Sequence, residues 1–566
     1  MIINGFRPQQ FEHPQLGPIT GRKRNEHVVQ FRSIPYGHVA ARFRHATLIS
    51  ELPPKRRSFT EYGHACPQTE QGMEPFGGPI PGDEKRDYDE FSCLNLTITA
   101  PVSVLKSGST KKVPVMVYVH GGGFTVGAHY GGPNGNAFTV LFRFTRRQFN
   151  MNLADTTRMV TQACEDSRAI IVDFWPAKQD LVDEAASLNE DPCNFALYDQ
   201  RLAFQWVQKF ISGFGGDINR ITAFGESAGS SSLAFHLSSN VPLFDRAILQ
   251  SGTASAISPK PLADKEEEYQ ALLDFCRISL DDPQRLEKLR AVPTDKIVEA
   301  ASSINKAAFS PLADKSFFPV IPNYLNHAKI ISDCYWVEAI ITGDAVFEGY
   351  LFAHNLKAVR PEVFYQHVEN ALGAENAERV LETYEISRTM DQNLFWTRLC
   401  TLCGDVMFSL PCHILSKALW QSGKKQYRCI LSLRNPFPGS FFSGVLGHHF
   451  IELVYQFMTF MERLPLQRQR DVCVGFVRRW TAFAYGEEPW SQYTWVDETV
   501  AVADSREGWV VRSRVKDLEV SVYDEGGQRR YEKWEALDEL FQSLGQKAPA
   551  AVEALSFPTV VALGNK

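Results

Sequence analysis

Short apolar runs divide the chain and predict the strands of a buried sheet. The clearest run, 113–119, is apolar almost throughout. Further runs of this kind lie at 169–172, 221–224, 339–343 and 427–433. Other segments carry apolar residues at helical spacing, most clearly 394–415, which predicts a helix in the core or in a lid.

A Gly-Glu-Ser-Ala-Gly sequence at 225–229 follows one of these predicted strands. The next residues, 230–235, can continue as a helix. Strand, tight turn and helix are the context of a nucleophile elbow, whose strained turn exposes one serine hydroxyl and leaves no room for a Cβ at its glycines. The pattern predicts Ser227 as a nucleophile. A glycine-rich turn with a surface serine is the alternative for the bare pentapeptide.

A second glycine motif, His-Gly-Gly-Gly-Phe at 120–124, directly follows the strand predicted at 113–119. Consecutive glycines leave backbone N–H groups free to point into a cavity. Acyl transfer needs such donors, because negative charge collects on the carbonyl oxygen in the transition state. The motif and the elbow together predict an oxyanion hole formed by the N–H groups of Gly122, Gly123 and Ala228. A glycine linker is disfavoured, because linkers do not usually follow a buried strand directly.

The chain resembles the type-B carboxylesterase/lipase family, which includes the cholinesterases. Besides the two motifs, the resemblance rests on 194–200, 206–208 and 214–222. It begins near residue 17, is highly specific between 113 and 252 apart from one stretch, and continues more faintly to about residue 485. It implies an α/β-hydrolase fold, with a large, mixed, mostly parallel central sheet flanked by helices and with helical cap or lid insertions. It also implies hydrolysis of carboxylic esters with no cofactor and no metal.

The triad acid follows from chain order, because α/β-hydrolases present serine, then Asp or Glu, then histidine. The strand predicted at 339–343 leads into 344–352, which is similar to the glutamate-bearing loop of the family. Glu348, followed by glycine, is the predicted acid. Asp344, four residues earlier, is the alternative.

The triad base is expected in the loop after the strand predicted at 427–433. The family pattern has a histidine three residues before an acidic residue, and counting back from Glu452 selects His449. The adjacent His448 is the alternative.

The resemblance also implies a disulfide between Cys66 and Cys93, which occupy the places of the family's first bridge. The motifs from Gly121 to Glu452 must form one site, so we expect a single domain over 1–566. Within it, 486–566 forms a charged C-terminal extension packed on or beside the core.

Composition agrees with a large enzyme: 44% of the 566 residues are hydrophobic, enough for a sizeable core. With 59 basic and 65 acidic residues, the chain has no basic block that would indicate nucleic acid. A small-molecule or lipid ester is the expected substrate, and the oligomeric state stays open. We see no apolar run long enough for a membrane span and no secretory signal, so we expect an intracellular, cytoplasmic location, or secretion if the true N-terminus is missing.

Two alternative functions remain beside a general carboxylesterase. A lipase or a specialised natural-product esterase would use the same triad. A non-catalytic, cholinesterase-like adhesion protein is disfavoured, because Ser227, Glu348 and His449 are all present.

The segment 134–152 departs from the family pattern and is expected to be a surface insert. After it the strand predicted at 169–172 appears, but the Asn-Tyr-Arg-like turn of the family is absent. We predict that deletion of 134–152 keeps or raises both solubility and esterase activity, since doubling a loop's length costs only about 0.6 kcal/mol. Soluble yield and turnover of the deletion variant are the measurements. Unfolding of the variant would contradict the prediction.

Overall fold

The computed structural model describes residues 7–23, 25–68, 87–106, 110–127, 159–163, 179–304, 308–458, 461–521 and 529–565. For a few of these, including 159–163, it describes the backbone alone.

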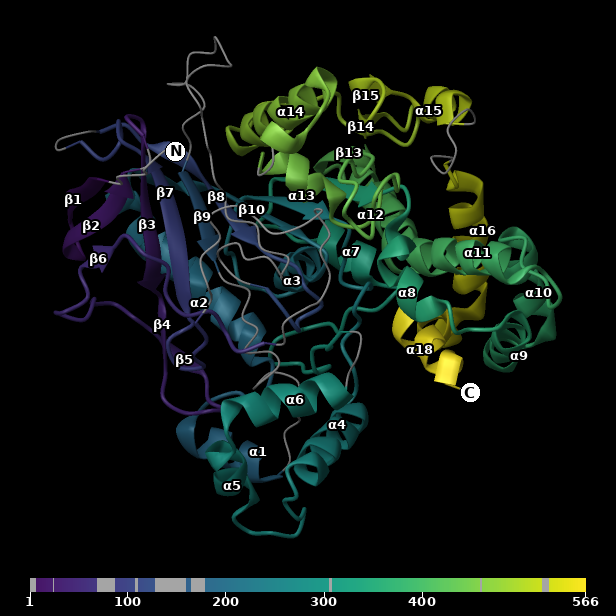
Figure 1. Cartoon of the computed structure of the whole chain (residues 1–566), viewed down its shortest axis with the longest axis horizontal. Helices are drawn as coiled ribbons and strands as arrows, with labels where there is room; N and C mark the ends of the chain where they lie inside the picture. Colours follow the sequence, from purple (N-terminus) through teal and green to yellow (C-terminus); the bar gives the residue numbers. More distant parts are fainter. Residues whose placement is uncertain are drawn as a thin grey trace.

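A single large sheet runs through the described part of the molecule (Figure 1). Its 13 strands follow the order β1-β2-β3-β7-β9-β8-β10-β11-β12-β13-β14-β15, with β6 paired to β2. The strands are β1 (Arg7–His13), β2 (Gly17–Lys23), β3 (Val28–Pro35), β6 (Ser58–Phe59), β7 (Asn95–Pro101), β8 (Val113–Val119), β9 (Met159–Ala163), β10 (Gly216–Glu226), β11 (Arg246–Gln250), β12 (Ala339–Ala345), β13 (Lys425–Ser432), β14 (Val500–Asp504) and β15 (Gly508–Arg512). A separate hairpin pairs β4 (Gly37–Val39) with β5 (Ala46–Leu48).

The centre of the sheet is parallel, from β9 through β8, β10, β11, β12 and β13 to β14. Every residue of β8 and of β12 is buried, as the apolar runs predict for strands covered on both faces. Antiparallel pairing is confined to the two edges, β1-β2-β3-β7-β9 and β14-β15. Parallel strands bring their carboxyl ends to one edge, where α/β proteins hold their sites.

Helices cover both faces of the sheet (Figure 1). The side chains of β8 alternate: Val115 and Val117 join a core cluster that includes α2, α3 and α7, whereas Met116 and Tyr118 join one that includes α13 and α14. The helices are α1 (Gln179–Leu188), α2 (Phe195–Phe210), α3 (Ala228–Leu237), α4 (Leu262–Phe275), α5 (Arg285–Ala291), α6 (Thr294–Ile304), α7 (His327–Ser332), α8 (Ala353–Leu356), α9 (Pro361–Leu372), α10 (Ala374–Thr383), α11 (Gln392–Gly404), α12 (Leu410–Gln421), α13 (Ile451–Gln456), α14 (Gln467–Ala484), α15 (Arg514–Ser521), α16 (Tyr531–Leu544), α17 (Ala548–Ala554) and α18 (Phe557–Val561). This arrangement confirms the predicted α/β-hydrolase architecture.

One strand differs from the sequence prediction. The position between β7 and β8 is filled by β9, Met159–Ala163, and not by the expected 169–172. Residues 169–172 and the expected insert 134–152 both lie outside the described residues. The prediction was wrong because it chose the most apolar run in the part of the chain after the glycine loop. Pairing between β7 and β8 requires only an extended backbone whose hydrogen bonds are satisfied by the two neighbouring strands.

The helical stripe predicted at 394–415 forms one continuous run, in which α11 and α12 are joined by a π-helical turn, η4 (Asp405–Ser409). The run from Gln392 to Gln421 passes a length and composition test for a membrane span, but 89% of its most apolar window is buried inside the protein. Burial of this kind is typical of a core helix. The described residues therefore give no clear transmembrane segment.

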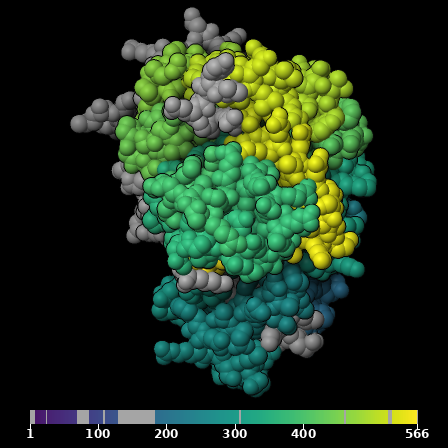
Figure 2. Space-filling view, turned by 90° about the vertical axis from the view of Figure 1, so that its right-hand side faces the viewer, coloured from purple at the N-terminus to yellow at the C-terminus, as the bar shows by residue number. Residues whose placement is uncertain are grey.

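The C-terminal segment continues the main sheet and does not simply lie beside it. Strand β14 pairs in parallel with β13, and α16 and α17 pack in one core cluster with α9, α10 and α11. In Figure 2 this segment, drawn in yellow, borders the green surface of those helices. The assignment of 1–566 to one domain stays a prediction.

Candidate active site

Ser227 lies on a tight turn between β10, which ends at Glu226, and α3, which begins at Ala228. Its backbone has φ 58° and ψ −126°, a conformation that non-glycine residues rarely adopt. A Cβ at Gly225 would lie 2.6 Å from the carbonyl carbon of Gly229, so the turn closes only with glycine there. Within 221–230, Ser227 alone is not fully buried. The turn has the geometry of a nucleophile elbow.

The glycine loop after β8 lies against this elbow. Gly122 has φ 128°, and a Cβ on it would lie 1.9 Å from the carbonyl oxygen of Val126, so no other residue fits. Gly122, Gly123, Ser227 and Ala228 line one pocket of about 180 Å³ together with His449. The structure thus brings the predicted oxyanion-hole residues to the predicted nucleophile and base.

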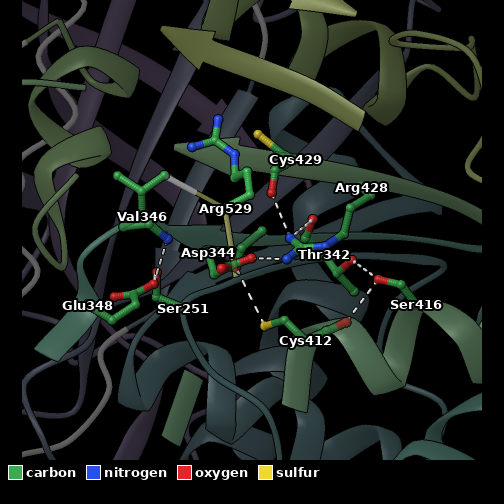
Figure 3. A network of polar contacts seen from close by, with 12 residues as sticks. Ser251, Thr342, Asp344, Val346, Glu348, Cys412, Ser416, Arg428, Cys429 and Arg529 are labelled. Atoms are coloured by element: carbon green, nitrogen blue, oxygen red, sulfur yellow. Dashed lines mark hydrogen bonds and ion pairs between the residues drawn. The ribbon is translucent and has the colours of Figure 1, made fainter. Parts of the chain in front are cut away.

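Glu348 begins the 3₁₀ turn η3 (Glu348–Phe352), just past the carboxyl end of β12, and is 1% exposed. Its Oε2 accepts a hydrogen bond of 2.6 Å from Nδ1 of His449. Its Oε1 accepts bonds of 2.7 Å from the Ser251 hydroxyl, visible in Figure 3, and of 2.6 Å from the backbone N–H of Ala345. These contacts fix the carboxylate and hold the histidine ring in one orientation.

Asp344, the alternative acid, is turned toward a different partner. Its carboxylate forms an ion pair with the guanidinium of Arg428 on β13, and both side chains are 2% exposed (Figure 3). Arg428 also donates a bond of 2.6 Å to the carbonyl oxygen of Cys429. Asp344 therefore balances a buried charge behind Glu348, while Glu348 contacts the histidine.

The two adjacent histidines have different surroundings. His448 donates from Nδ1 to the carbonyl oxygen of His449 at 2.6 Å and accepts at Nε2 from the Asn435 amide at 3.0 Å. Burial lowers the pKa of His448 to about 3, so its ring stays neutral at ordinary pH. With both nitrogens occupied and one face stacked on Phe442, His448 is a structural residue. His449 is the histidine that reaches the pocket.

Two further carboxyl groups surround His449. Oε1 of Glu226, the residue before the nucleophile, lies 3.1 Å from Nε2 of the ring. Glu452, which guided the choice of His449, is fully buried and accepts a bond of 3.1 Å from Gln250. Burial, with the nearby charges of Glu226 and Glu348, raises the pKa of Glu452 and favours its neutral form.

Sequence reasoning missed several residues of the site. Ser251, which bonds Glu348, directly follows β11, so a polar residue at the carboxyl end of a central strand was the available signal. Phe408 packs its ring 4.6 Å from that of His449, and the helical stripe that contains it was interpreted only as core or lid. Phe557 and Pro558 line the pocket from α18, more than a hundred residues beyond β13, the strand that precedes the base loop. No local sequence pattern could reveal a contact over this separation.

The predicted bridge partners Cys66 and Cys93 are both buried in the same core cluster. The disulfide between them stays a prediction. Among the described residues, no group of three or more His, Cys, Asp or Glu side chains is placed to hold a metal ion.

We predict that Glu348→Gln lowers kcat for ester hydrolysis about 10²–10⁴-fold, because His449 loses the carboxylate that orients it. Asp344→Asn should instead lower stability by about 3–5 kcal/mol, since Arg428 is left buried without its counter-ion. Thermal unfolding and turnover per folded molecule, measured on both variants, separate the two effects. The opposite pattern would make Asp344 the acid.

We predict that His449→Ala lowers kcat by several orders of magnitude, whereas His448→Ala costs about tenfold or less. The difference follows from their contacts, since His449 bonds Glu348 whereas the ring nitrogens of His448 bond the His449 carbonyl and Asn435. Steady-state kinetics on the two folded variants provide the measurement. A larger loss in His448→Ala would show that the base is assigned one residue too late.

The sequence also matches the model of a known protein family. The model of the carboxylesterase family matches residues 9–138 and 186–510, most of the chain. The gap in the match contains most of the expected insert at 134–152 and the whole of the expected strand at 169–172.

Individual relatives match at lower coverage. The inactive carboxylesterase-like protein VdtD of Byssochlamys spectabilis is 29% identical over 314 residues, which is 53% of this chain and 48% of that protein. Cholinesterase of Mus musculus is 28% identical over 53% of this chain and 47% of its own length. The chain thus spans about half the length of these two relatives. Lipase 3 of Yarrowia lipolytica is 25% identical over 82% of this chain and 86% of its own length.

Solved structures show the same architecture. A PNB esterase superposes with a TM-score of 0.68 at 22% identity, covering 93% of this chain and 99% of that one. The EST55 carboxylesterase of Geobacillus stearothermophilus gives 0.67 at 20% identity, covering 91% and 100%. At these identities the likeness shows the fold, while the family model shows the membership. The chain belongs to the carboxylesterase family.

Proposed function

We propose that this protein hydrolyses carboxylic esters through a Ser227–His449–Glu348 triad. The observation that carries the proposal is the 2.6 Å bond between Glu348 and Nδ1 of His449. That histidine lines one pocket with the strained serine elbow and the glycine loop. A nucleophile, an oriented base and oxyanion donors around one cavity are the parts that acyl transfer requires.

In the proposed reaction, Ser227 Oγ attacks the ester carbonyl carbon while Nε2 of His449 accepts the hydroxyl proton. Glu348 stabilises the imidazolium that forms. The N–H groups of Gly122, Gly123 and Ala228 bind the oxyanion of the tetrahedral intermediate.

Collapse of this intermediate breaks the ester bond. The alcohol leaves with the proton from His449, and the acyl group stays on Ser227. A water molecule, activated by His449, then attacks the acyl-enzyme and releases the acid.

The pocket favours a small, apolar group next to the scissile bond. Its volume of about 180 Å³ is below the 300–1,000 Å³ typical of drug-sized ligands. Its apolar walls include Leu351, Phe352, Met407, Phe408 and Phe557. We therefore favour an esterase of short-chain substrates over a long-chain lipase.

We predict that Ser227→Ala abolishes ester hydrolysis, by at least about 10³-fold, and also abolishes labelling by a fluorophosphonate. The fold should remain, because alanine removes only the hydroxyl. The assay uses p-nitrophenyl esters of increasing acyl length, and peptide mapping locates the label. Short acyl chains should be preferred.

The same assays on the wild-type protein distinguish an active esterase from a family member without catalytic activity. Hydrolysis and labelling that both require Ser227 support the proposal. A folded wild-type protein with neither would contradict it, as would full activity in Ser227→Ala.

A further inference from the structure

The π-helical turn η4 interrupts the long α11–α12 helix beside the pocket. Such turns insert one extra residue into a helix and are frequent at functional sites. Here η4 presents Met407 and Phe408 to the pocket, while Asp405 is buried and does not line it. The ring of Phe408 lies 4.6 Å from the ring of His449, at an angle of 39°. The position of η4 therefore sets one wall against which the catalytic imidazole rests.

Asp405 joins this turn to the C-terminal segment. Its carboxylate is 1% exposed and accepts bonds from Arg530 Nε at 2.7 Å and from Arg530 Nη2 at 2.6 Å. The hydroxyl of Tyr384 donates a third bond at 2.9 Å. Arg530 is the N-cap residue of α16, more than a hundred residues beyond Asp405 in the sequence.

The same guanidinium also contacts the acid loop. Nη2 of Arg530 donates to the carbonyl oxygen of Val346 at 3.0 Å, two residues before Glu348. That loop is joined to the base loop, because the N–H of Phe347 donates to the carbonyl oxygen of Gly447 at 2.8 Å. One side chain thus fixes η4 relative to the loop that carries Glu348.

Arginine suits this position better than lysine would. Its planar fork donates in several fixed directions at once, whereas the lysine ammonium is a compact charge on a flexible stem. A lysine at 530 could pair with Asp405 but could not hold both carboxylate oxygens and the Val346 carbonyl in the same geometry.

We propose that Arg530 is a positioning residue for catalysis, which fixes η4 and the Glu348 loop at the spacing that the Glu348–His449 pair requires. This inference rests on the proposed function. Arg530 acts through Phe408, which contacts the His449 ring, and through Val346, which precedes Glu348. A small displacement of either would disturb the orientation of the imidazole, and displacements of about 1 Å can cost 10²-fold in rate.

The test compares Arg530→Gln, Arg530→Lys and the double variant Arg530→Gln/Asp405→Asn with wild type. Turnover of a short-chain p-nitrophenyl ester is measured per site titrated by a fluorophosphonate, at a temperature where circular dichroism shows each variant fully folded. We expect Arg530→Gln to lower kcat about tenfold or more with KM within about twofold, because alignment and not binding is lost. Arg530→Lys should recover part of the loss.

The double variant separates positioning from charge. It removes the carboxylate that Arg530→Gln alone would strand, so it should fold well even if the single variant does not. Its kcat should stay low, because the connection to Val346 is still missing. Recovery of wild-type kcat in the double variant would overturn the proposal.

Arg514 offers a matched control in the same C-terminal segment. It makes a comparable bidentate ion pair with Glu535 of α16, in which Nη1 and Nη2 donate to the two carboxylate oxygens at 2.6 and 3.0 Å. Arg514 does not line the pocket. Arg514→Gln should lower the melting temperature while leaving kcat within about twofold of wild type. Equal kcat losses at the two positions would show a general stability effect and overturn the proposal.

The outcomes also separate this inference from the proposed function. Wild-type protein without Ser227-dependent hydrolysis overturns both. Normal wild-type activity with unchanged kcat per titrated site in Arg530→Gln overturns the role of Arg530 alone.

Discussion

The hydrogen bond between Glu348 and His449 is the constraint on which the site depends. It joins two loops that leave the neighbouring strands β12 and β13, and both side chains are almost completely buried. A bond of 2.6 Å between such groups needs backbones held in a fixed relation. The parallel pairing of β12 with β13 and the bond from Phe347 to Gly447 provide it. Replacement of water by these fixed partners strengthens the electrostatic contact.

Burial of this pair imposes conditions on the charges around it. Glu226, Glu348 and Glu452 all lie near one imidazole, and the raised pKa of Glu452 relieves part of their repulsion. Asp344 would add another negative charge, but Arg428 neutralises it. A lone buried charge would be costly. The Arg428 guanidinium compensates the charge of Asp344, and the raised pKa of Glu452 favours a proton on that carboxyl group.

Distant parts of the chain complete the site. Phe557 from α18 stacks on Phe352 with ring centroids 3.6 Å apart and lines the pocket. Arg530 connects the turn η4 to the acid loop. The segment predicted from the sequence as a C-terminal extension therefore contributes residues to the pocket and to the loop that carries Glu348.

The sequence alone determined the features that depend on local geometry. The elbow at Ser227 and the loop at Gly122 were predictable because a strained turn and a close backbone approach each require glycine at fixed spacing. Chain order and spacing then indicated Glu348 and His449; the structure places His449 at the pocket and joins Glu348 to that histidine by a hydrogen bond. Only the tertiary structure showed that Glu348 contacts His449 while Asp344 pairs with Arg428 of another strand. It also placed β9 at Met159–Ala163, Phe408 against the His449 ring, Phe557 in the pocket wall and Arg530 on the Val346 carbonyl, because these contacts join residues with no local pattern in common.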